Sequence, residues 1–166
     1  MNTHRGFTLL ELLVVLVIIG LFSSLVMMSV TPNDNQVTHR EAKRLIHTIQ
    51  LAQDEAIMQG VQLGVTVQAD RYFFSRLQDN VWLPLVGDPD LTEYVLAPPL
   101  MMTIEIEGDN VVLKNVANSL IPAVMILSSG EITSFKLSLL NQEIPDRVFQ
   151  IIGQENGQLS LQLPNE

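Results

Sequence analysis

The sequence is short of cysteine, of cations and of enzyme motifs, and each shortage excludes a class of protein. With no cysteine, the chain forms no disulfide and builds no thiolate metal site. Only 9 Lys and Arg stand against 18 Asp and Glu, so the formal net charge is -9 at pH 7. Because nucleic-acid binding needs clustered cations to neutralise phosphates, nucleic acid is a disfavoured partner. The nearest approach to a cluster is Arg40, Lys43 and Arg44, among which acidic residues are interleaved, and we interpret it as a solvated helix face.

Motifs of enzyme and cofactor chemistry are missing as well. The sequence lacks G-x-S-x-G, H-E-x-x-H, the phosphate-binding loop and the dinucleotide-binding fingerprint. We therefore predict no enzyme activity, no catalytic residue and no cofactor. His39 and His47 lie eight residues apart, which is not the i,i+4 spacing of a metal pair on a helix. We expect both to be surface histidines.

One acidic loop has residues of the type that binds calcium. Asp88, Asp90 and Glu93 offer spaced carboxylates. Pro89 and the lack of a glycine at the sharp-turn position do not fit a calcium-binding loop. We expect a solvated acidic loop there and no metal.

The sequence does have a long uncharged apolar run near its start. From Leu12 to Val30 there are 19 residues without a charge, and as a helix they span about 28 Å, close to the hydrocarbon thickness of a bilayer. A secretory signal peptide has a shorter apolar region that ends in a small-residue cleavage site, whereas this run ends in the polar "TPNDNQ". We therefore predict a transmembrane helix that is retained in the mature protein.

The charges that flank the run predict its orientation. Arg5 and the amino terminus precede it, whereas Asp34 follows it before any Lys or Arg. The positive-inside rule then leaves the N-terminus in the cytoplasm and places the rest of the chain in the periplasm, after a single pass through the inner membrane. A plain anchor or a buried core helix does not explain Glu11, a carboxylate at the start of the run, where burial without a partner is costly.

The stretch from Gly6 to Gly20, "GFTLLELLVVLVIIG", resembles the class III signal sequence of type IV pilins and type II secretion pseudopilins. Members of that family carry a short charged leader ending in glycine, then a phenylalanine, a glutamate four positions later and a long apolar helix. The resemblance implies that a prepilin peptidase cleaves between Gly6 and Phe7 and methylates the new amino group of Phe7.

The same resemblance implies a role for Glu11 in assembly. Its partner would be the methylated, cationic N-terminus of a neighbouring subunit. At about 4 Å and an effective dielectric constant of about 20, such a pair interacts by about 4 kcal/mol before desolvation is subtracted. A pair of that strength favours one axial stagger between subunits over the others.

After the apolar run, the sequence predicts a break and a second helix. Pro32 lacks a backbone donor and disfavours helical angles in the preceding residue. Apolar residues then recur every three or four positions over residues 37–59. Thr38 and Glu41 form a possible capping box at the start, and Gly60 is a plausible stop.

The remainder of the chain is typical of strands. Residues 63–68 and 71–77 predict a hairpin, and Asn156-Gly157 is a strong turn signal. We predict an α+β fold, in which a long N-terminal helix, half membrane-embedded and half amphipathic, packs on an antiparallel β-rich globular domain. The other predicted strands are residues 81–85, 94–96, 101–106, 111–115, 123–127, 133–140, 148–152 and 159–163.

The stretch "MILSSGEITSFKLSL" resembles the C-terminal signature of the H-type minor pseudopilins, the general secretion pathway protein H family. That signature is an apolar strand, a Ser-Gly-Glu turn, a phenylalanine and an alternating strand. Ser129, Gly130, Glu131 and Phe135 match it, while the proline that the family has beside the turn is absent. T/U-type minor pilins share this domain, and the resemblance implies their common pilin-like fold.

Four parts are therefore expected. Residues 1–6 are a cleaved leader, 7–30 the transmembrane and filament-core helix, 31–59 the kink and amphipathic helix, and 60–166 the β-rich periplasmic domain. The resemblance implies a minor pseudopilin of the type II secretion system, assembled near the tip of a periplasmic pseudopilus that drives export of folded proteins. The implied partners are other major and minor pseudopilins, the prepilin peptidase and the inner-membrane secretion platform.

Two alternatives stay open. One is a minor pilin of a type IV pilus, of the T/U type, with a role in pilus assembly or DNA uptake. The other is a membrane-anchored periplasmic enzyme or ligand-binding protein, which would not be cleaved after Gly6.

Overall fold

The computed structural model describes residues 9–29, 34–106, 109–111 and 121–164. The chain divides into two compact units, Met1–Asn33 and Asp34–Glu166, and each is described by itself. Gly6, Phe7, Val30 and Pro32 lie outside the described residues, so the predicted cleavage site and the predicted kink do too.

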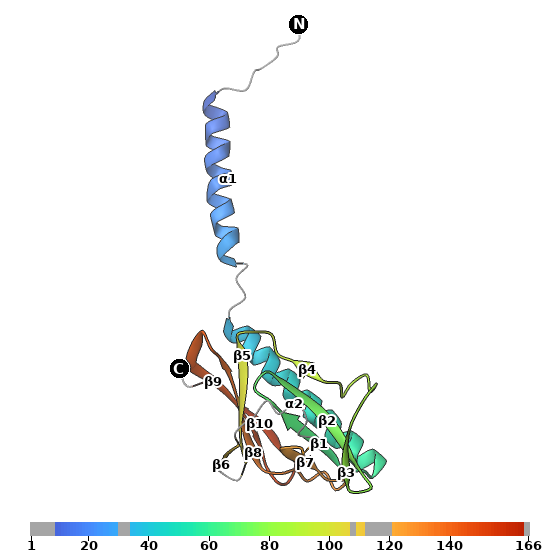
Figure 1. The fold of residues 1–166 in the computed structure, drawn as a ribbon. Coiled ribbons are helices and arrows are strands. Elements are labelled where there is room, and N and C mark those ends of the chain that lie inside the picture. Colours follow the sequence, from blue (N-terminus) through green and yellow to red (C-terminus); the bar gives the residue numbers. More distant parts are fainter. Residues whose placement is uncertain (1–8, 30–33, 107–108, 112–120, 165–166) are drawn as a thin grey trace. The chain divides into compact units, whose positions relative to one another are not determined.

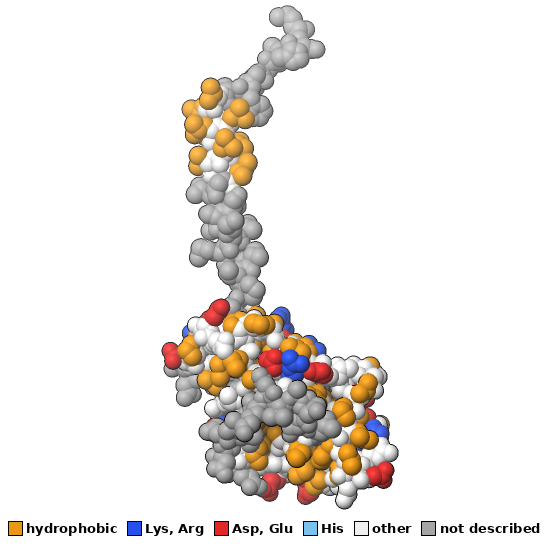
Figure 2. Space-filling view, viewed as in Figure 1, with side chains coloured by type: hydrophobic (Ala, Val, Ile, Leu, Met, Phe, Trp, Pro, Cys, Tyr) orange, Lys and Arg blue, Asp and Glu red, His pale blue; other side chains and the backbone are white. Residues whose placement is uncertain are grey.

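The first unit is built around α1, Leu9–Ser29 (Figure 1). The helix begins three residues before the predicted apolar run, and Glu11 lies exposed in its first turn. Hydrophobic side chains cover the visible face of its described part, from Leu9 to Ile19 (Figure 2), and every side chain in that part is exposed within the unit. Among the residues open to description, none of the helices meets the combined length and hydropathy required of a membrane span.

The second unit begins with α2, Asp34–Gln59, which is amphipathic as predicted. It buries one row of side chains, each at most 2% exposed, formed by Ala42, Leu45, Ile49, Ala52 and Ala56. Three of these five are alanines, which let the helix backbone approach the strands closely.

The predicted capping box is wrong. Because α2 starts at Asp34, Thr38 lies in its second turn, where it is only 2% exposed and cannot cap the helix start. Glu41 instead accepts a hydrogen bond at 2.9 Å from the hydroxyl of Tyr94 in the β-rich part.

The predicted stop at Gly60 is confirmed. Gly60 has a φ of +64°, and its N–H donates to the Ile57 carbonyl at 3.3 Å. The Val61 N–H donates to the Ala56 carbonyl at 3.1 Å. Together these two bonds form the Schellman arrangement, which requires a left-handed residue at this position.

The first sheet has the strand order β3-β2-β1-β7, with β4 paired to β2. The predicted hairpin is confirmed, since β1 and β2 pair antiparallel with Val67 opposite Tyr72. The strands of this sheet are β1 (Leu63–Val67), β2 (Arg71–Gln78), β3 (Val81–Pro84), β4 (Tyr94–Val95) and β7 (Val124–Ile126).

The second sheet has the order β10-β9-β8-β5-β6, and all of its pairs are antiparallel. The strand predicted at residues 111–115 is tested only at Val111, which belongs to β6, because residues 112–115 lie outside the described part. β9 begins earlier than predicted and contains Pro145, close to a register shift between β8 and β9, where a missing ladder donor is tolerated. The strands of this sheet are β5 (Leu100–Ile106), β6 (Asp109–Val111), β8 (Phe135–Asn141), β9 (Ile144–Gly153) and β10 (Leu159–Gln162).

α2 joins the two sheets into one core. It contacts β1 and β7 of the first sheet and β8, β9 and β10 of the second (Figure 1). Buried residues alternate along β8, where Phe135, Leu137 and Leu139 point to the core. The observed architecture confirms the predicted α+β class, with the amphipathic helix packed on antiparallel strands.

The cap of α2 yields a stability prediction. Gly60→Ala should lower the free energy of unfolding by about 1 kcal/mol, because a Cβ disfavours the left-handed conformation while no atom lies within 4 Å of the added carbon. Gly60→Asn should lower it less, since asparagine tolerates that conformation. Denaturant titration of the detergent-solubilised full chain measures both variants, and an alanine variant as stable as the parent would contradict the assigned cap.

Candidate functional site

The family-signature turn, Ser129-Gly130-Glu131, connects β7 to β8. The Gly130 N–H donates to the Leu127 carbonyl at 2.9 Å, and the Leu127 N–H donates to the Glu131 carbonyl at 2.8 Å. Gly130 has a φ of +89°, which explains the glycine. The Ser129 hydroxyl donates to the Glu131 carboxylate at 3.1 Å, so both polar side chains of the signature stabilise the turn itself.

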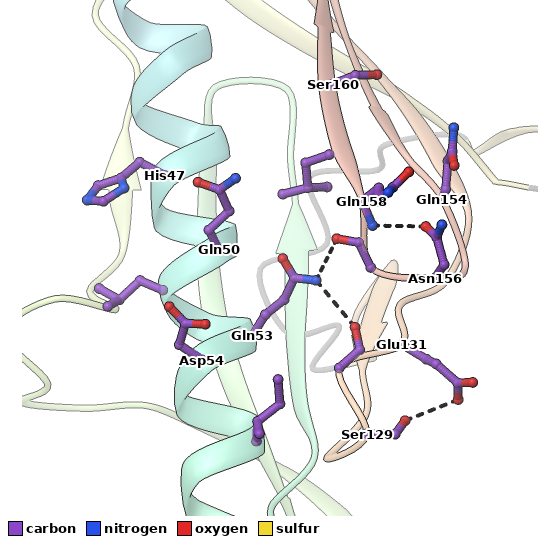
Figure 3. Close-up of a pocket in the computed structure, with 15 residues that line it drawn as sticks. His47, Gln50, Gln53, Asp54, Ser129, Glu131, Gln154, Asn156, Gln158 and Ser160 are labelled. Carbon is purple, nitrogen blue, oxygen red and sulfur yellow. Dashed lines mark hydrogen bonds between the residues drawn. The ribbon is translucent and has the colours of Figure 1, made fainter.

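A glutamine of α2 connects this turn to the β9–β10 hairpin. The Gln53 side-chain amide donates to the Gly157 carbonyl at 2.9 Å and to the Gly130 carbonyl at 3.4 Å (Figure 3). Gln53 is only 8% exposed. A Cβ on Gly157 would lie 2.4 Å from the Gly130 carbonyl oxygen, so the two turns can approach this closely only with glycine there. We call the Gln53 side chain and its two carbonyl partners the Gln53 bridge.

The last signature residue, Phe135, is a core residue. It is 3% exposed and lies opposite Gly153 across the β8–β9 ladder. A Cβ added to Gly153 would lie 2.2 Å from the Phe135 ring. The aromatic ring therefore covers the Gly153 backbone. The signature residues thus have structural roles: Ser129, Gly130 and Glu131 form the turn, and Phe135 packs in the core.

A polar cleft of about 840 Å³ opens between α2, the signature turn and the β9–β10 hairpin (Figure 3). The Gln53 bridge lies in its wall, Asp54 and Glu131 carry its negative charges, and Asn156 and Gln158 belong to the hairpin side. Among the described residues that line it, the only basic one is His47.

The predicted solvated basic face is confirmed, because Arg40, Lys43 and Arg44 are all exposed. The Arg44 guanidinium also lies 3.7 Å from the centre of the Tyr94 ring. Burial, followed by the hydrogen bond to Glu41, raises the pKa of Tyr94. His39 is not a simple surface residue, because its half-buried ring stacks on Phe149 at 5.7 Å.

In the acidic loop, Asp88 and Glu93 have different partners. Asp88 accepts hydrogen bonds from the N–H groups of Asp90 and Leu91, both at 2.9 Å. Glu93 pairs with Arg71 at 3.0 Å. No three His, Asp or Glu residues within the described ranges are placed to hold a metal ion.

The same arginine also contacts the β1–β2 turn. Arg71 pairs with Asp70 at 3.2 Å, and its hydrogen bond lowers the pKa of the Asp70 carboxyl group. Arg71 thus connects the β1–β2 turn to the acidic loop through two surface ion pairs.

Two groups of predicted residues fall in different units. Glu11 belongs to the first unit, and the signature residues to the second. The sequence interpretation missed Gln53 and Gly153, and it predicted Gly157 only as part of a turn, which the structure has. Gln53 follows Ala52 of the buried α2 row, but Lys43 and Gln50 also follow members of that row and are exposed, so this position gives no sequence signal for the Gln53 contact.

An apolar N-terminal helix, followed by an amphipathic helix on antiparallel sheets, defines the pilin-like class of protein. Solved structures share the fold. The minor pseudopilin EpsH of the Vibrio cholerae type 2 secretion system matches with a TM-score of 0.67 and 29% identity, over 78% of this chain and 98% of that one. The Pseudomonas aeruginosa type IV minor pilin FimU matches with a TM-score of 0.54 and 13% identity, over 81% and 92%, which shows the fold alone.

Sequence comparison identifies the family. The prokaryotic N-terminal methylation motif matches residues 1–27, and the family described as type II transport protein GspH matches residues 41–157. Type II secretion system protein H of Pseudomonas aeruginosa is 32% identical over 84% of both chains, and that of Aeromonas hydrophila is 29% identical over 97% of this chain and 96% of the relative. The chain belongs to the GspH family, the H-type minor pseudopilins of type II secretion.

The Gln53 bridge predicts a selective loss of stability. Gln53→Leu keeps the side-chain size but leaves two carbonyls without their donor, so the free energy of unfolding should fall by about 1–3 kcal/mol. Gln50→Leu is the matched control, because Gln50 is exposed on the same helix and its change should stay within about 0.5 kcal/mol. Equal effects in a thermal unfolding experiment would mean that the bridge contributes nothing.

The contact between Phe135 and Gly153 predicts coupling. Gly153→Ala should destabilise the protein by about 1–3 kcal/mol, because the ring must move in a packed core. In a double-mutant cycle with Phe135→Leu, the double variant should lose less than the sum of the single losses. Strict additivity would show that the ring and the glycine do not share this space.

Proposed function

We propose that this minor pseudopilin is cleaved between Gly6 and Phe7, methylated on the new amino group of Phe7, and assembled into the periplasmic pseudopilus near its tip. The observation that carries the proposal is the methylation-motif match over residues 1–27, together with a glutamate in the first turn of an apolar helix. In this proposal the filament supports export of folded proteins by the type II secretion system.

The apolar character of α1 supports a filament-core role. Its described side chains are hydrophobic around the helix, apart from Glu11, and exposed within their own unit. A helix that is apolar on all sides needs other helices or lipid around it. In our proposal residues 12–30 cross the inner membrane once before assembly, with the N-terminus cytoplasmic and the second unit periplasmic, and later pack against the helices of neighbouring subunits.

Glu11 is the proposed register residue. A carboxylate among packed apolar helices is costly unless a cation meets it. Cleavage before Phe7 creates such a cation, four positions from the acid in sequence. Pairing of Glu11 with the N-terminus of the next subunit would stabilise one axial stagger between neighbouring subunits over the others.

The partners follow from this role. Other major and minor pseudopilins are the proposed neighbours, the prepilin peptidase the proposed processing enzyme, and the inner-membrane platform the proposed site of assembly. The signature turn supports a structural action rather than a catalytic one, since Ser129 and Glu131 bond to each other and Phe135 is buried.

A type IV pilus role is the second candidate, favoured only by the shared fold of FimU. Protein H relatives of type II secretion match over most of this chain, which supports the first candidate. Deletion of the gene separates the two. Loss of exoprotein secretion with surface pili intact fits the first, whereas loss of twitching or DNA uptake with secretion intact would contradict it.

Glu11→Ala should leave cleavage largely intact and reduce co-purification with partner pseudopilins on the order of tenfold or more, because it removes an interaction of about 4 kcal/mol before desolvation. Glu11→Gln should behave similarly, since it keeps the shape and loses the charge. Affinity purification from detergent-solubilised membranes measures the effect.

Val14→Ala in the same helix is the control, and it should co-purify normally. If Glu11→Ala co-purifies as well as this control, the proposed role of the acid is wrong.

A further inference from the structure

The β3 edge of the first sheet is uncharged and apolar. β3 is the last strand on its side of the sheet, and its side chains Val81 and Leu83 are 53% and 43% exposed. An open edge pairs readily with another chain, and native sheets blunt their edges with charged side chains or covering elements. Of the usual protections, β3 has only its short length and Pro84 at its end.

Two other edges show what protection looks like in this protein. At the β7 edge, the Thr133 N–H donates to the Met125 carbonyl at 2.9 Å, so a neighbouring segment occupies that edge. β6, at the edge of the second sheet, carries the charge of Asp109. β3 has neither kind of protection in the part of the chain that the structure describes.

The geometry of the hairpin fixes which backbone groups of β3 face outward. The β2–β3 turn has two residues of positive φ, Asp79 at 49° and Asn80 at 63°, as in the tight turn that is flanked by a hydrogen-bonded pair. Hydrogen-bonded and non-hydrogen-bonded pairs alternate from there, and the Leu85 N–H donates to the Phe74 carbonyl at 3.0 Å, as this alternation requires. Trp82 falls in a non-hydrogen-bonded pair, so its N–H and C=O groups face the open edge.

Packing on both faces holds β3 in place. The Trp82 ring lies over Gly64 of β1, where an added Cβ would be 3.0 Å from the ring. On the other face, Arg76 lies opposite Leu83 and donates to the Gln59 side chain at 2.7 Å, near the end of α2 (Figure 1). The edge is therefore ordered before a partner arrives, which reduces the entropy cost of binding.

Carboxylates stand at both ends of the strand. Asp79 is exposed in the turn before β3, and Asp88 and Asp90 follow it in the acidic loop. None of the three forms an ion pair with a described residue. A second copy of this chain, with its own net charge of -9, would be repelled. The complementary segment is apolar in its middle and carries Lys or Arg at its ends.

We propose that β3 receives an extended segment of a different pseudopilin as an added strand. The segment hydrogen-bonds to the outward N–H and C=O groups of Trp82, and its apolar side chains cover Val81 and Leu83. Its basic residues lie near Asp79 and the acidic loop. The inference rests on the proposed assembly and assigns one surface through which a neighbouring pseudopilin contacts the second unit.

Substitutions of exposed residues test the contact in the full-length chain. Val81→Lys should reduce co-purification of other pseudopilins from detergent-solubilised membranes by about tenfold, because it places a cation in the apolar contact and repels the basic partner. Val95→Lys is the matched control, since Val95 is 51% exposed on β4 of the same sheet, and its yield should stay within about twofold. Asp79→Asn tolerates the left-handed turn and should lower the yield by up to about fivefold, as for an exposed ion pair.

Hydrogen exchange at single amides tests the addition of a strand. In the full chain co-purified with its pseudopilin partner, the Trp82 amide should exchange about tenfold more slowly than in the chain alone, because it gains an acceptor. The Leu83 amide is the internal control. It is already paired with β2 in the hairpin, so its exchange should change much less.

Four outcomes would overturn the inference. Equal yields from Val81→Lys and Val95→Lys place the contact elsewhere, and an undiminished yield from Asp79→Asn contradicts a basic partner. Unchanged exchange at Trp82 in an intact complex refutes strand addition. Protection of Trp82 by a second copy, or by a protein that is not a pseudopilin, identifies another occupant. With leader cleavage and secretion intact, each of these leaves the proposed function standing, whereas a parent chain that is not cleaved contradicts the proposed function itself.

Discussion

A carboxylate in the first turn of an apolar helix is the constraint on which the functional interpretation of this chain depends. Glu11 would be costly among apolar neighbours unless a cation compensates it, and the polypeptide contains no Lys or Arg between Arg5 and Arg40. In our proposal a neighbouring subunit provides that cation. Cleavage beside Phe7 would supply one on every subunit, which links processing, anchoring and assembly through a single charge pair.

The second unit depends on how closely α2 approaches the strands. Its alanine-rich row lets the backbone lie near both sheets, and the Gln53 bridge then joins the helix to two turns that are far apart in sequence. Gly157 permits the approach of those turns, and the Phe135 ring occupies the space above Gly153. The signature turn is thus packed against α2 and the β9–β10 hairpin, and these three elements form the walls of the cleft.

Sequence patterns correctly predicted the features that depend on neighbouring residues in the chain. The α2 row, the stop at Gly60 and the β1–β2 hairpin follow from periodicity and turn chemistry, and the structure has them. The capping box failed because a four-residue pattern does not show where a helix begins, and Asp34 starts it a turn earlier. The Gln53 bridge could not be predicted, since its carbonyl partners lie 77 and 104 residues away and become its neighbours only through the tertiary fold.

The mature N-terminus provides the most direct test of the central claim. Intact-mass analysis of the protein extracted from membranes of cells with an active prepilin peptidase should show a chain that begins at Phe7 and carries one added methyl group. A chain that still begins at Met1 would contradict the account, because Glu11 would then lack the cationic terminus with which it is proposed to pair.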